Sequence, residues 1–349
     1  MRLLFALLVV AVLAVAPPAA AQVPAADAGP FAGQGMWIHE VPRSEGGDAA
    51  AIASRAAAAG MSHVVVKAAH GTQAWAQFDA SLVEALHAAG LRVCAYQRAL
   101  AIRPAAEARV LAATVALGVD CVVIDAEIEY QGRYTAARSY MRALRRAIGP
   151  TFPVGLTSFP YVDLHGNFPY SVFLGAGGAQ YNLPQMYWRL LGTSVSGVFA
   201  RTWSQNAVYG RPVVPLGQSW GPATRAEVRR FRSLAAARGA GGVSWWVWQL
   251  ATKRHWAGMT DPLPAPVRLF SAQPGFAPLR YGGRGDPVRW LQLRLRAAGE
   301  YVPVTGRFLG QTARAVERFR AAAGLPAAGA LVDDAAWAAL LAAAPPDAP

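Results

Sequence analysis

Residues 92–129 read RVCAYQRALAIRPAAEARVLAATVALGVDCVVIDAEIE, and this stretch predicts the fold of the larger part of the chain. It begins with an apolar run at Arg92–Gln97, continues through an alanine-rich segment at Ala105–Leu117, and ends in a second apolar run at Cys121–Glu129. Gly118 suits the C-terminal cap of a helix. Near-continuous apolar runs indicate strands that are buried on both faces, as in parallel sheets. The stretch therefore predicts a strand–helix–strand unit.

This unit recurs, so that strand and helix alternate eight times between residues 35 and 249. Eight units in about 215 residues fit an α/β protein of the (β/α)8 TIM barrel type, which typically takes ~250 residues. An open doubly wound sheet is the alternative, but no glycine-rich phosphate loop follows the first strand. The predicted strands are Gly35–Val41, His63–Ala69, Arg92–Gln97, Cys121–Glu129, Pro153–Phe159, Tyr181–Trp188, Pro212–Trp220 and Gly242–Gln249.

Three acidic residues lie at alternate positions of the fourth predicted strand: Asp125, Glu127 and Glu129. Alternate residues of a strand share a face, and the active site of a barrel forms at the C-terminal ends of its strands. Neighbouring carboxylates raise one another's pKa, so one acid can stay protonated near neutral pH. Glycoside cleavage needs such a proton donor beside a second group that supplies or orients the nucleophile. The alternative is ion pairing with nearby arginines or Lys67.

Other polar and aromatic side chains are predicted at the same end of the barrel. Flat rings there could stack on sugar rings, although core packing is the alternative role for any single aromatic residue. His39, His70 and His165 are interpreted as loop or core residues rather than catalytic bases. The candidate substrate-binding residues are Glu40, Tyr96, Gln185, Tyr187, Trp188, Gln218, Trp220 and Trp248.

The two cysteines, Cys94 and Cys121, each fall inside a predicted buried strand. We expect inert core thiols, and the assumed strand registers place one side chain inside the barrel and the other outside, which argues against a disulfide. Neither cysteine has a neighbouring Cys or His at zinc-binding spacing. We expect no metal site and no cofactor.

The N-terminal residues 1–21 are typical of a secretory signal peptide. Arg2 precedes an apolar region at Leu3–Val15, and Ala19–Ala21 offers a small-residue cleavage site. The apolar run is short for a membrane span, and Pro17 and Pro18 break it off. The mature protein is therefore expected in the cell envelope or outside the cell, without stable insertion in a membrane.

The chain carries a formal net charge of +13, almost all of it from arginine. A GC-rich genome is the plain explanation for much of this basicity, and attraction to anionic polymers such as cell wall is the functional one. Nucleic acid is disfavoured as a partner because the chain has an export signal and no basic-aromatic binding motif. We expect a monomer.

The C-terminal segment predicts a separate helical domain. From Leu279 it reads LRYGGRGDPVRWLQLRLRAAGEY, then TGRFLGQTARAVERFRAAAGL at residues 305–325, with apolar residues at helical spacing and glycines between the helices. Its ordered motif, with Gly285–Asp286, Leu291–Gln292 and the late Trp337, resembles the three-helix peptidoglycan-binding domain of bacterial wall enzymes over residues 276–341. Arg320 stands where that family usually has Gln, a change expected to alter surface chemistry more than fold.

The barrel resembles two glycosidase families over roughly residues 35–250. Asp125 and Glu127 match the Asp-x-Glu of family 25 muramidases, which implies Glu127 as general acid. The first strand lacks the Asp of that family. Aligned on Glu129–Tyr130, the strand instead resembles family 18 chitinase-like enzymes, which implies Glu129 as the acid and attack by the acetamido group of the substrate, steered by Glu127 and Tyr187. Glu127 then replaces the usual Asp.

The sequence thus predicts a signal peptide (1–21), a glycosidase-like barrel (34–256), a proline-rich linker (257–275) and a wall-binding domain (276–341). Peptidoglycan is the expected partner and substrate, and the linker is expected to act as a semi-stiff tether that concentrates the enzyme on the wall. One rival is a non-catalytic barrel that serves as a glycan-binding or scaffold protein. Another is a glycosidase for a different polymer such as chitin.

Overall fold

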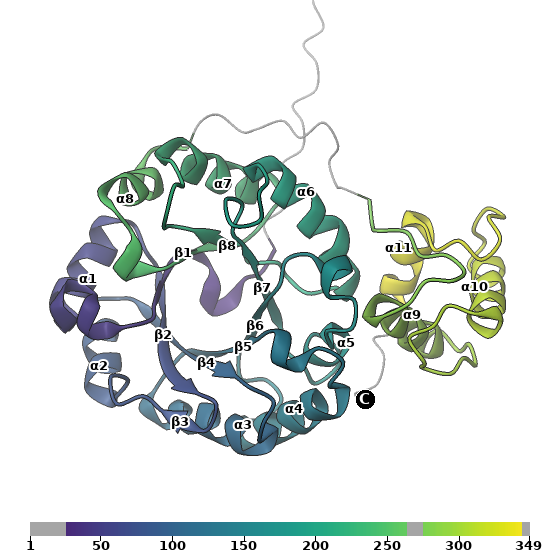
Figure 1. Ribbon diagram of the computed structural model, residues 1–349, viewed down its shortest axis with the longest axis horizontal. Helices are drawn as coiled ribbons and strands as arrows, with labels where there is room; N and C mark the ends of the chain where they lie inside the picture. Colours follow the sequence, from purple (N-terminus) through teal and green to yellow (C-terminus); the bar gives the residue numbers. More distant parts are fainter. Residues whose placement is uncertain (1–25, 264–274, 344–349) are drawn as a thin grey trace, which may run out of the picture.

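The computed structural model describes residues 26–263 and 275–343. The predicted signal peptide and most of the predicted linker lie outside these ranges. The described chain forms a closed barrel with a small helical domain beside it (Figure 1). Within these ranges, no helix combines the length and apolarity needed to cross a membrane.

Eight parallel strands close the barrel, which confirms the predicted fold class. The strand order is β1-β9-β8-β7-β6-β5-β4-β2, and pairing of β1 with β2 closes the ring. A two-residue strand, β3, pairs antiparallel to β2. The strands are β1 (Gly33–Ile38), β2 (His63–His70), β3 (Gln73–Ala74), β4 (Arg92–Ala99), β5 (Cys121–Ala126), β6 (Val154–Ser158), β7 (Tyr181–Met186), β8 (Leu216–Gln218) and β9 (Gly242–Trp246).

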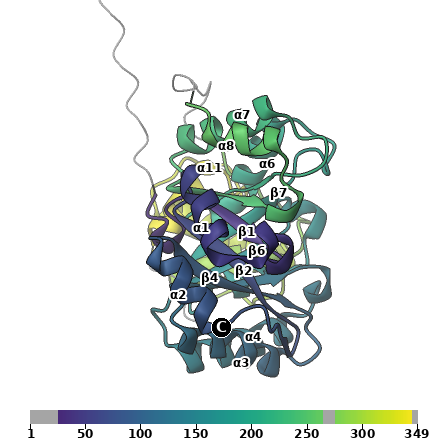
Figure 2. The same cartoon turned by 90° about the vertical axis from the view of Figure 1, so that its left-hand side faces the viewer.

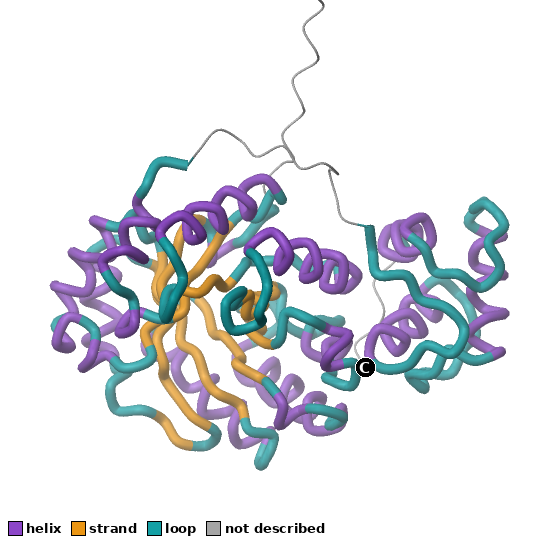
Figure 3. The backbone as a smooth tube through the Cα atoms, turned by 45° about the horizontal axis from the view of Figure 1, so that its top comes forward, coloured by secondary structure: helices purple, strands orange, loops and turns teal. Residues whose placement is uncertain are grey.

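Helices surround the strands on the outside of the barrel (Figures 1 and 3). Two apolar clusters result: the larger fills the space between strands and helices and continues into the small domain, and the other fills the barrel interior around Trp37, Tyr96 and Leu216. The barrel helices are α1 (Ala49–Ala58), α2 (Ala80–Ala88), α3 (Pro104–Ala113), α4 (Tyr134–Ile148), α5 (Tyr170–Phe173), α6 (Val195–Asn206), α7 (Arg225–Ala237) and α8 (Lys253–Thr260). Helix α8 thus continues into the segment predicted as linker.

Six of the eight barrel strands are shorter than expected: β1, β5, β6, β7, β8 and β9. Of these, β5 was predicted to carry the candidate acids. Strand β5 ends at Ala126, because the backbone of Glu127 (φ −134°, ψ −138°) leads into a 3-10 turn at Ile128–Tyr130. Glu129 is therefore in a turn and not on the strand. Strand β8 begins only at Leu216, since the preceding Pro215 has no N–H to donate to a neighbouring strand.

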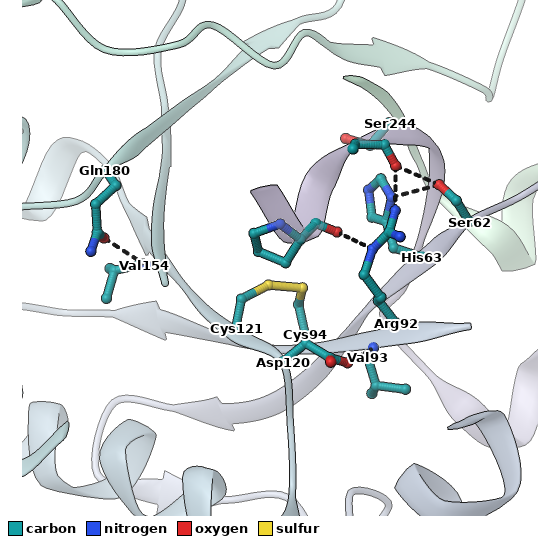
Figure 4. The surroundings of a disulfide bond; sticks show 12 residues. Ser62, His63, Arg92, Val93, Cys94, Asp120, Cys121, Val154, Gln180 and Ser244 are labelled. Atoms are coloured by element: carbon teal, nitrogen blue, oxygen red, sulfur yellow. Dashed lines mark hydrogen bonds between the residues drawn. A yellow bond between two sulfur atoms is a disulfide. The ribbon is translucent and has the colours of Figure 1, made fainter. Parts of the chain in front are cut away.

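The two cysteines form a disulfide, so the expectation of free thiols was wrong. Cys94 and Cys121 are register partners on the adjacent parallel strands β4 and β5, with their Cα atoms 4.6 Å apart. Both side chains belong to the cluster inside the barrel, because residues paired across parallel strands point to the same side. Figure 4 shows the bond spanning the two strands. The error lay in the assumed register.

The C-terminal domain consists of α9 (Asp286–Ala297), α10 (Gly310–Ala322) and α11 (Asp334–Ala342). Val288, Leu291, Val316 and Trp337 form part of its buried core. Arg320 is also buried, and its guanidinium donates to the carbonyls of Leu331 and Pro326 and to the carboxylate of Asp333 at 2.8–3.0 Å. Arg320 therefore organises the domain interior and is not the surface change that was expected.

Candidate active site

A cavity of about 130 Å³ opens at the C-terminal ends of the barrel strands. A larger cavity of about 600 Å³ lies near the N-terminal ends of β1 and β9, and no acidic residue lines it. The smaller cavity is below the ~300–1,000 Å³ of typical small-molecule sites, so it suits one sugar substituent better than a whole oligosaccharide. Its lining residues are Trp37, Asp125, Glu127, Thr157, Gln185, Tyr187, Leu216 and Trp246.

Two of the three predicted acids, Asp125 and Glu127, line this cavity in opposite protonation states. Burial, and then the charge of Glu127, raise the pKa of Asp125 to about 8. Burial acts in the same direction on Glu127, but hydrogen bonds from Arg98, Gln185 and Asp125 outweigh it and lower the pKa of that carboxyl. At neutral pH, Asp125 is thus a protonated donor hydrogen-bonded to an ionised Glu127.

Arg98, near the end of β4, contacts all three acids. One guanidinium nitrogen lies 3.5 Å from Asp125 and forms a close ion pair with Glu127, and the other lies 2.8 Å from Glu129. The arginine is mostly buried, with 17% of its side chain exposed. Sequence reasoning missed this residue, although Arg98 is the register partner of Asp125 across β4 and β5. Alignment of the two strands on their cysteines would have found it.

Polar groups from β6 and β7 face the two carboxyls. The Gln185 amide donates to Glu127 at 3.0 Å and lies 3.4 Å from Asp125. Burial and the nearby carboxyls raise the pKa of Tyr187 well above its usual value, so its hydroxyl stays protonated. Within the described part of the chain, the buried hydroxyl of Thr157 has no hydrogen-bond partner, and Thr157 lines the cavity. These groups could bind a polar ligand.

Tyr96 and Lys67 lie beside the cavity. The ring of Tyr96 contacts the rings of Trp37 and Trp246, with centroid distances of 4.9 and 5.9 Å. Both tryptophans line the cavity. The hydroxyl of Tyr96 is 2.7 Å from Nδ1 of His39. The ammonium of Lys67 is 4.8 Å from the centroid of the Tyr96 ring. Burial is the largest influence on the pKa of Lys67 and lowers it to about 8, although the charge of Glu127 acts in the opposite direction.

Two predicted tryptophans lie away from the cavity. Trp188 is fully buried in the outer core, where its ring packs against Phe231. Trp248 is 3% exposed, its indole N–H donates to Glu45, and its ring packs edge-on against Trp256. Each lies two residues beyond the end of its strand, β7 or β9, and the two rings pack against residues of α7 and α8.

The other predicted binding residues lie around the mouth of the barrel, outside the cavity lining. Glu40 pairs with Arg43 at 3.2 Å in the loop after β1. The buried Gln218 holds the backbone, since it accepts from the N–H of Arg189 and donates to the carbonyl of Trp220. The ring of Trp220 lies edge-on to that of Tyr187, with 6.3 Å between the ring centroids.

Across the described residues, no three His, Cys, Asp or Glu side chains are grouped so as to hold a metal ion. The carboxylic acid of Asp125, the carboxylate of Glu127 and the surrounding donors equip the cavity for acid–base chemistry.

Comparison with known proteins identifies the C-terminal domain. Residues 284–340 match the family model described as a putative peptidoglycan binding domain, which confirms the predicted resemblance for that segment. No curated protein sequence matches the chain.

The barrel is similar to solved structures of several activities. A chitinase from Chromobacterium violaceum ATCC 12472 shares 13% identity at a TM-score of 0.45, over 65% of this chain and 98% of the other. The Bacillus cereus spore cortex-lytic enzyme SleL shares 10% at 0.48, over 65% and 73%. An endo-1,4-beta-mannanase from Rhizomucor miehei shares 7% at 0.49, over 65% and 89%. At such low identity these similarities do not assign a reaction.

Proposed function

We propose that this protein is an exported glycoside hydrolase that cleaves the glycan strands of peptidoglycan. The observation that carries the proposal is the pair formed by a protonated Asp125 and an ionised Glu127 in a cavity at the C-terminal mouth of the barrel. A positioned carboxyl that keeps its proton near neutral pH is the proton source that general acid catalysis requires.

Glu127 is the proposed general acid, and Asp125 supplies its proton. Its side chain is 24% exposed, against 11% for Asp125, so it is the one that a substrate reaches. The proton of Asp125 moves along their shared hydrogen bond to Glu127, which passes it to the glycosidic oxygen as the bond from the sugar carbon breaks. Asp125 then remains as a carboxylate facing the positive charge that develops on the sugar.

The short distance between the two carboxyls favours attack by the substrate itself. Retaining and inverting glycosidases that use two carboxylates hold them about 5 Å or more apart, whereas Asp125 and Glu127 are hydrogen-bonded to each other. An acetamido group of the substrate is the nucleophile that this arrangement admits. The size of the cavity fits such a group, and Tyr187, Gln185 and Thr157 are positioned to bind it.

Two further features support action on the cell wall outside the cytoplasm. The match of residues 284–340 to a peptidoglycan-binding domain favours peptidoglycan as the polymer on which the barrel acts. The Cys94–Cys121 disulfide suits an oxidising compartment, since such bonds persist in exported proteins and are rare in the cytosol. Both agree with the signal peptide predicted at residues 1–21.

A non-catalytic glycan-binding barrel is the second candidate, and Arg98 is the observation that favours it. The guanidinium contacts Asp125, Glu127 and Glu129 together, as expected of a structural charge cluster. For this arginine to permit catalysis, the entering sugar must weaken its contact with Glu127, so that Glu127 can accept the proton of Asp125.

The test is to incubate the purified protein with bacterial sacculi and with chitin, and to identify soluble products by mass spectrometry. We expect muropeptides cut at one glycosidic bond from sacculi and nothing from a Glu127→Gln variant. Release from chitin alone would identify a different polymer as substrate. Binding to sacculi without release of any fragment, from either polymer, would favour the non-catalytic barrel.

A further inference from the structure

The first turn of α9 packs against the barrel next to α5 (Figure 1). Asp286, the first residue of α9, is fully buried although it is an acid. Its carboxylate accepts hydrogen bonds from the N–H and hydroxyl of Ser171 at 2.8 and 2.5 Å, and from the hydroxyl of Tyr209 at 2.8 Å. Both partners belong to the barrel. Since a buried carboxylate is costly unless it is hydrogen-bonded, the domain is stable in this position only while these contacts are made.

The backbone reinforces the same contact. The N–H of Asp286 donates to the carbonyl of Gly166 at 2.5 Å. The preceding Gly285 has a left-handed φ of 98°, and a Cβ at this position would lie 2.2 Å from the Gly166 oxygen. Only glycine allows so close an approach in that conformation. The domain and the barrel are therefore fitted to each other at backbone level.

Two other residues of α9 extend the interface. The Arg289 guanidinium lies 4.3 Å from the centroid of the Tyr134 ring at the start of α4. The indole N–H of Trp290 donates to the carbonyl of Val208, and Trp290 is 2% exposed. Helix α9 thus contacts the barrel at α4, at α5 and just before Tyr209.

Two of the barrel segments that α9 contacts lead back to the carboxyl pair. The acid loop (residues 127–133) begins with Glu127 and ends just before Tyr134, and the rim loop (residues 159–169) follows the strand that carries Thr157. The N–H of Gly132 donates to the carbonyl of Asn167 at 2.8 Å and joins the two loops.

Within the rim loop, the ring of His165, which precedes Gly166, stacks on Phe159 at 3.4 Å. His165 lies close enough to Glu127 for the charge of that carboxylate to oppose the lowering of the His165 pKa by burial. Asp286 is thus hydrogen-bonded to the rim loop at Gly166, the rim loop is hydrogen-bonded to the acid loop through Asn167 and Gly132, and His165 of the rim loop lies near Glu127.

We propose that Asp286 is a positioning residue, through which the C-terminal domain holds the acid loop and the rim loop in place around the cavity. The domain is then a brace for the barrel mouth as well as an anchor on the wall. The catalytic consequence rests on the proposed function, whereas the bracing itself does not. A purely tethering domain would leave both loops unaffected.

Hydrogen exchange of backbone amides in the full-length protein tests the bracing without any substrate. Asp286→Ala and, from the barrel side, Ser171→Ala should speed exchange in residues 128–134 and 159–171 by roughly tenfold, because each leaves buried hydrogen-bonding groups unpaired. Exchange in β1, β2 and β4 should stay unchanged and so show that the barrel is folded. Glu317→Ala, which removes an exposed acid of the same domain, should alter neither loop. Unchanged exchange at both loops in Asp286→Ala would overturn the proposal.

Activity on a short soluble glycan, which needs no wall anchoring, then tests the catalytic consequence. Asp286→Ala should lower kcat about tenfold with a much smaller change in KM, and Asp286→Asn, which keeps the shape and one acceptor oxygen, should recover most of the loss. An unchanged kcat in Asp286→Ala would contradict the positioning role. If the parent protein cleaves no glycan, the proposed function fails, and the exchange experiment still decides the bracing.

Discussion

One carboxyl group in the barrel mouth keeps a proton that its neighbour has lost. Burial holds the proton on Asp125, while Arg98 and Gln185 hold the charge on Glu127. The two groups are two residues apart on one side of the chain, so the spacing that was visible in the sequence does bring them together. Their unequal states depend on Arg98 and Gln185, which come from other strands.

The raised pKa of Asp125 predicts the alkaline limit of activity. Because the reaction needs Asp125 protonated, activity should be full below the pKa of about 8 and be lost as the pH rises through it. A pH–rate profile for soluble substrate checks this. Lys67 also has a pKa of about 8, so Lys67→Met is the control. If the alkaline limit disappears in Lys67→Met, the lysine and not the acid sets it.

Arg98 should matter for stability as well as for the site. Removing one partner of a mostly buried ion-pair cluster typically costs about 3–5 kcal/mol, because the remaining charges are left uncompensated. We expect Arg98→Met to lower the free energy of unfolding by that order in chemical denaturation. The exposed Arg43, which pairs with Glu40 at the surface, provides a matched control whose replacement should cost less than about 1 kcal/mol. Equal losses of unfolding free energy for the two variants would show that the Arg98 cluster contributes no more to stability than a surface ion pair.

At the scale of strands and helices, the apolar runs predicted the existence of the barrel elements better than their ends. All eight strands were expected, because strands buried on both faces must be apolar. The ends could not be read from the sequence, since polar residues such as Glu127 are tolerated at the mouth of the barrel whether or not they are extended. Glu129 was therefore assigned to the strand although it lies in the following turn.

Contacts between strands were the part of the site that sequence reasoning could not supply. The register of β4 against β5 places Cys94 opposite Cys121 and Arg98 opposite Asp125, and register depends on the closed barrel as a whole. The same limit explains why Trp188 and Trp248 were assigned to the sugar site. Tryptophan is a residue type that such sites use, but these two rings pack into the outer core.

The disulfide should stabilise the pairing of β4 with β5. Closing a loop across a sequence separation of 27 residues typically contributes about 2–4 kcal/mol to the free energy of unfolding. The double variant Cys94→Ala, Cys121→Ala should lose this amount in denaturant titrations. Adding a reducing agent should lower the free energy of unfolding of the parent protein toward that of the variant, and should leave the value for the variant unchanged. Equal stability of the oxidised parent and the variant would mean that the bond contributes nothing.

In the whole molecule, the barrel and the C-terminal domain pack against each other, and the chain that forms them is strongly basic. Figure 2, turned by a quarter from Figure 1, shows the C-terminal domain partly behind the barrel, where α11 and the barrel helices overlap. The sequence predicted a domain joined to the barrel only by a tether. In the structure, α9 also packs on the barrel through Asp286 and Trp290.

The net charge of +13 predicts that binding to sacculi depends on salt. Attraction between a basic protein and an anionic polymer weakens as ions screen it. The amount of protein that sediments with sacculi should therefore fall steadily between low and high salt. Binding to chitin, which is uncharged, is the matched comparison and should change little. Salt-independent binding to sacculi would show that the arginines are not involved.

The most direct test of the account compares two single substitutions on one soluble N-acetylated glycan. Glu127→Gln removes the proposed general acid, and Glu129→Gln removes an acid that contacts the same arginine outside the cavity lining. We predict a loss in kcat of about 10²–10⁴-fold for Glu127→Gln and less than about tenfold for Glu129→Gln. The reverse order, with Glu129→Gln inactive and Glu127→Gln active, would contradict the assignment of the carboxyl pair.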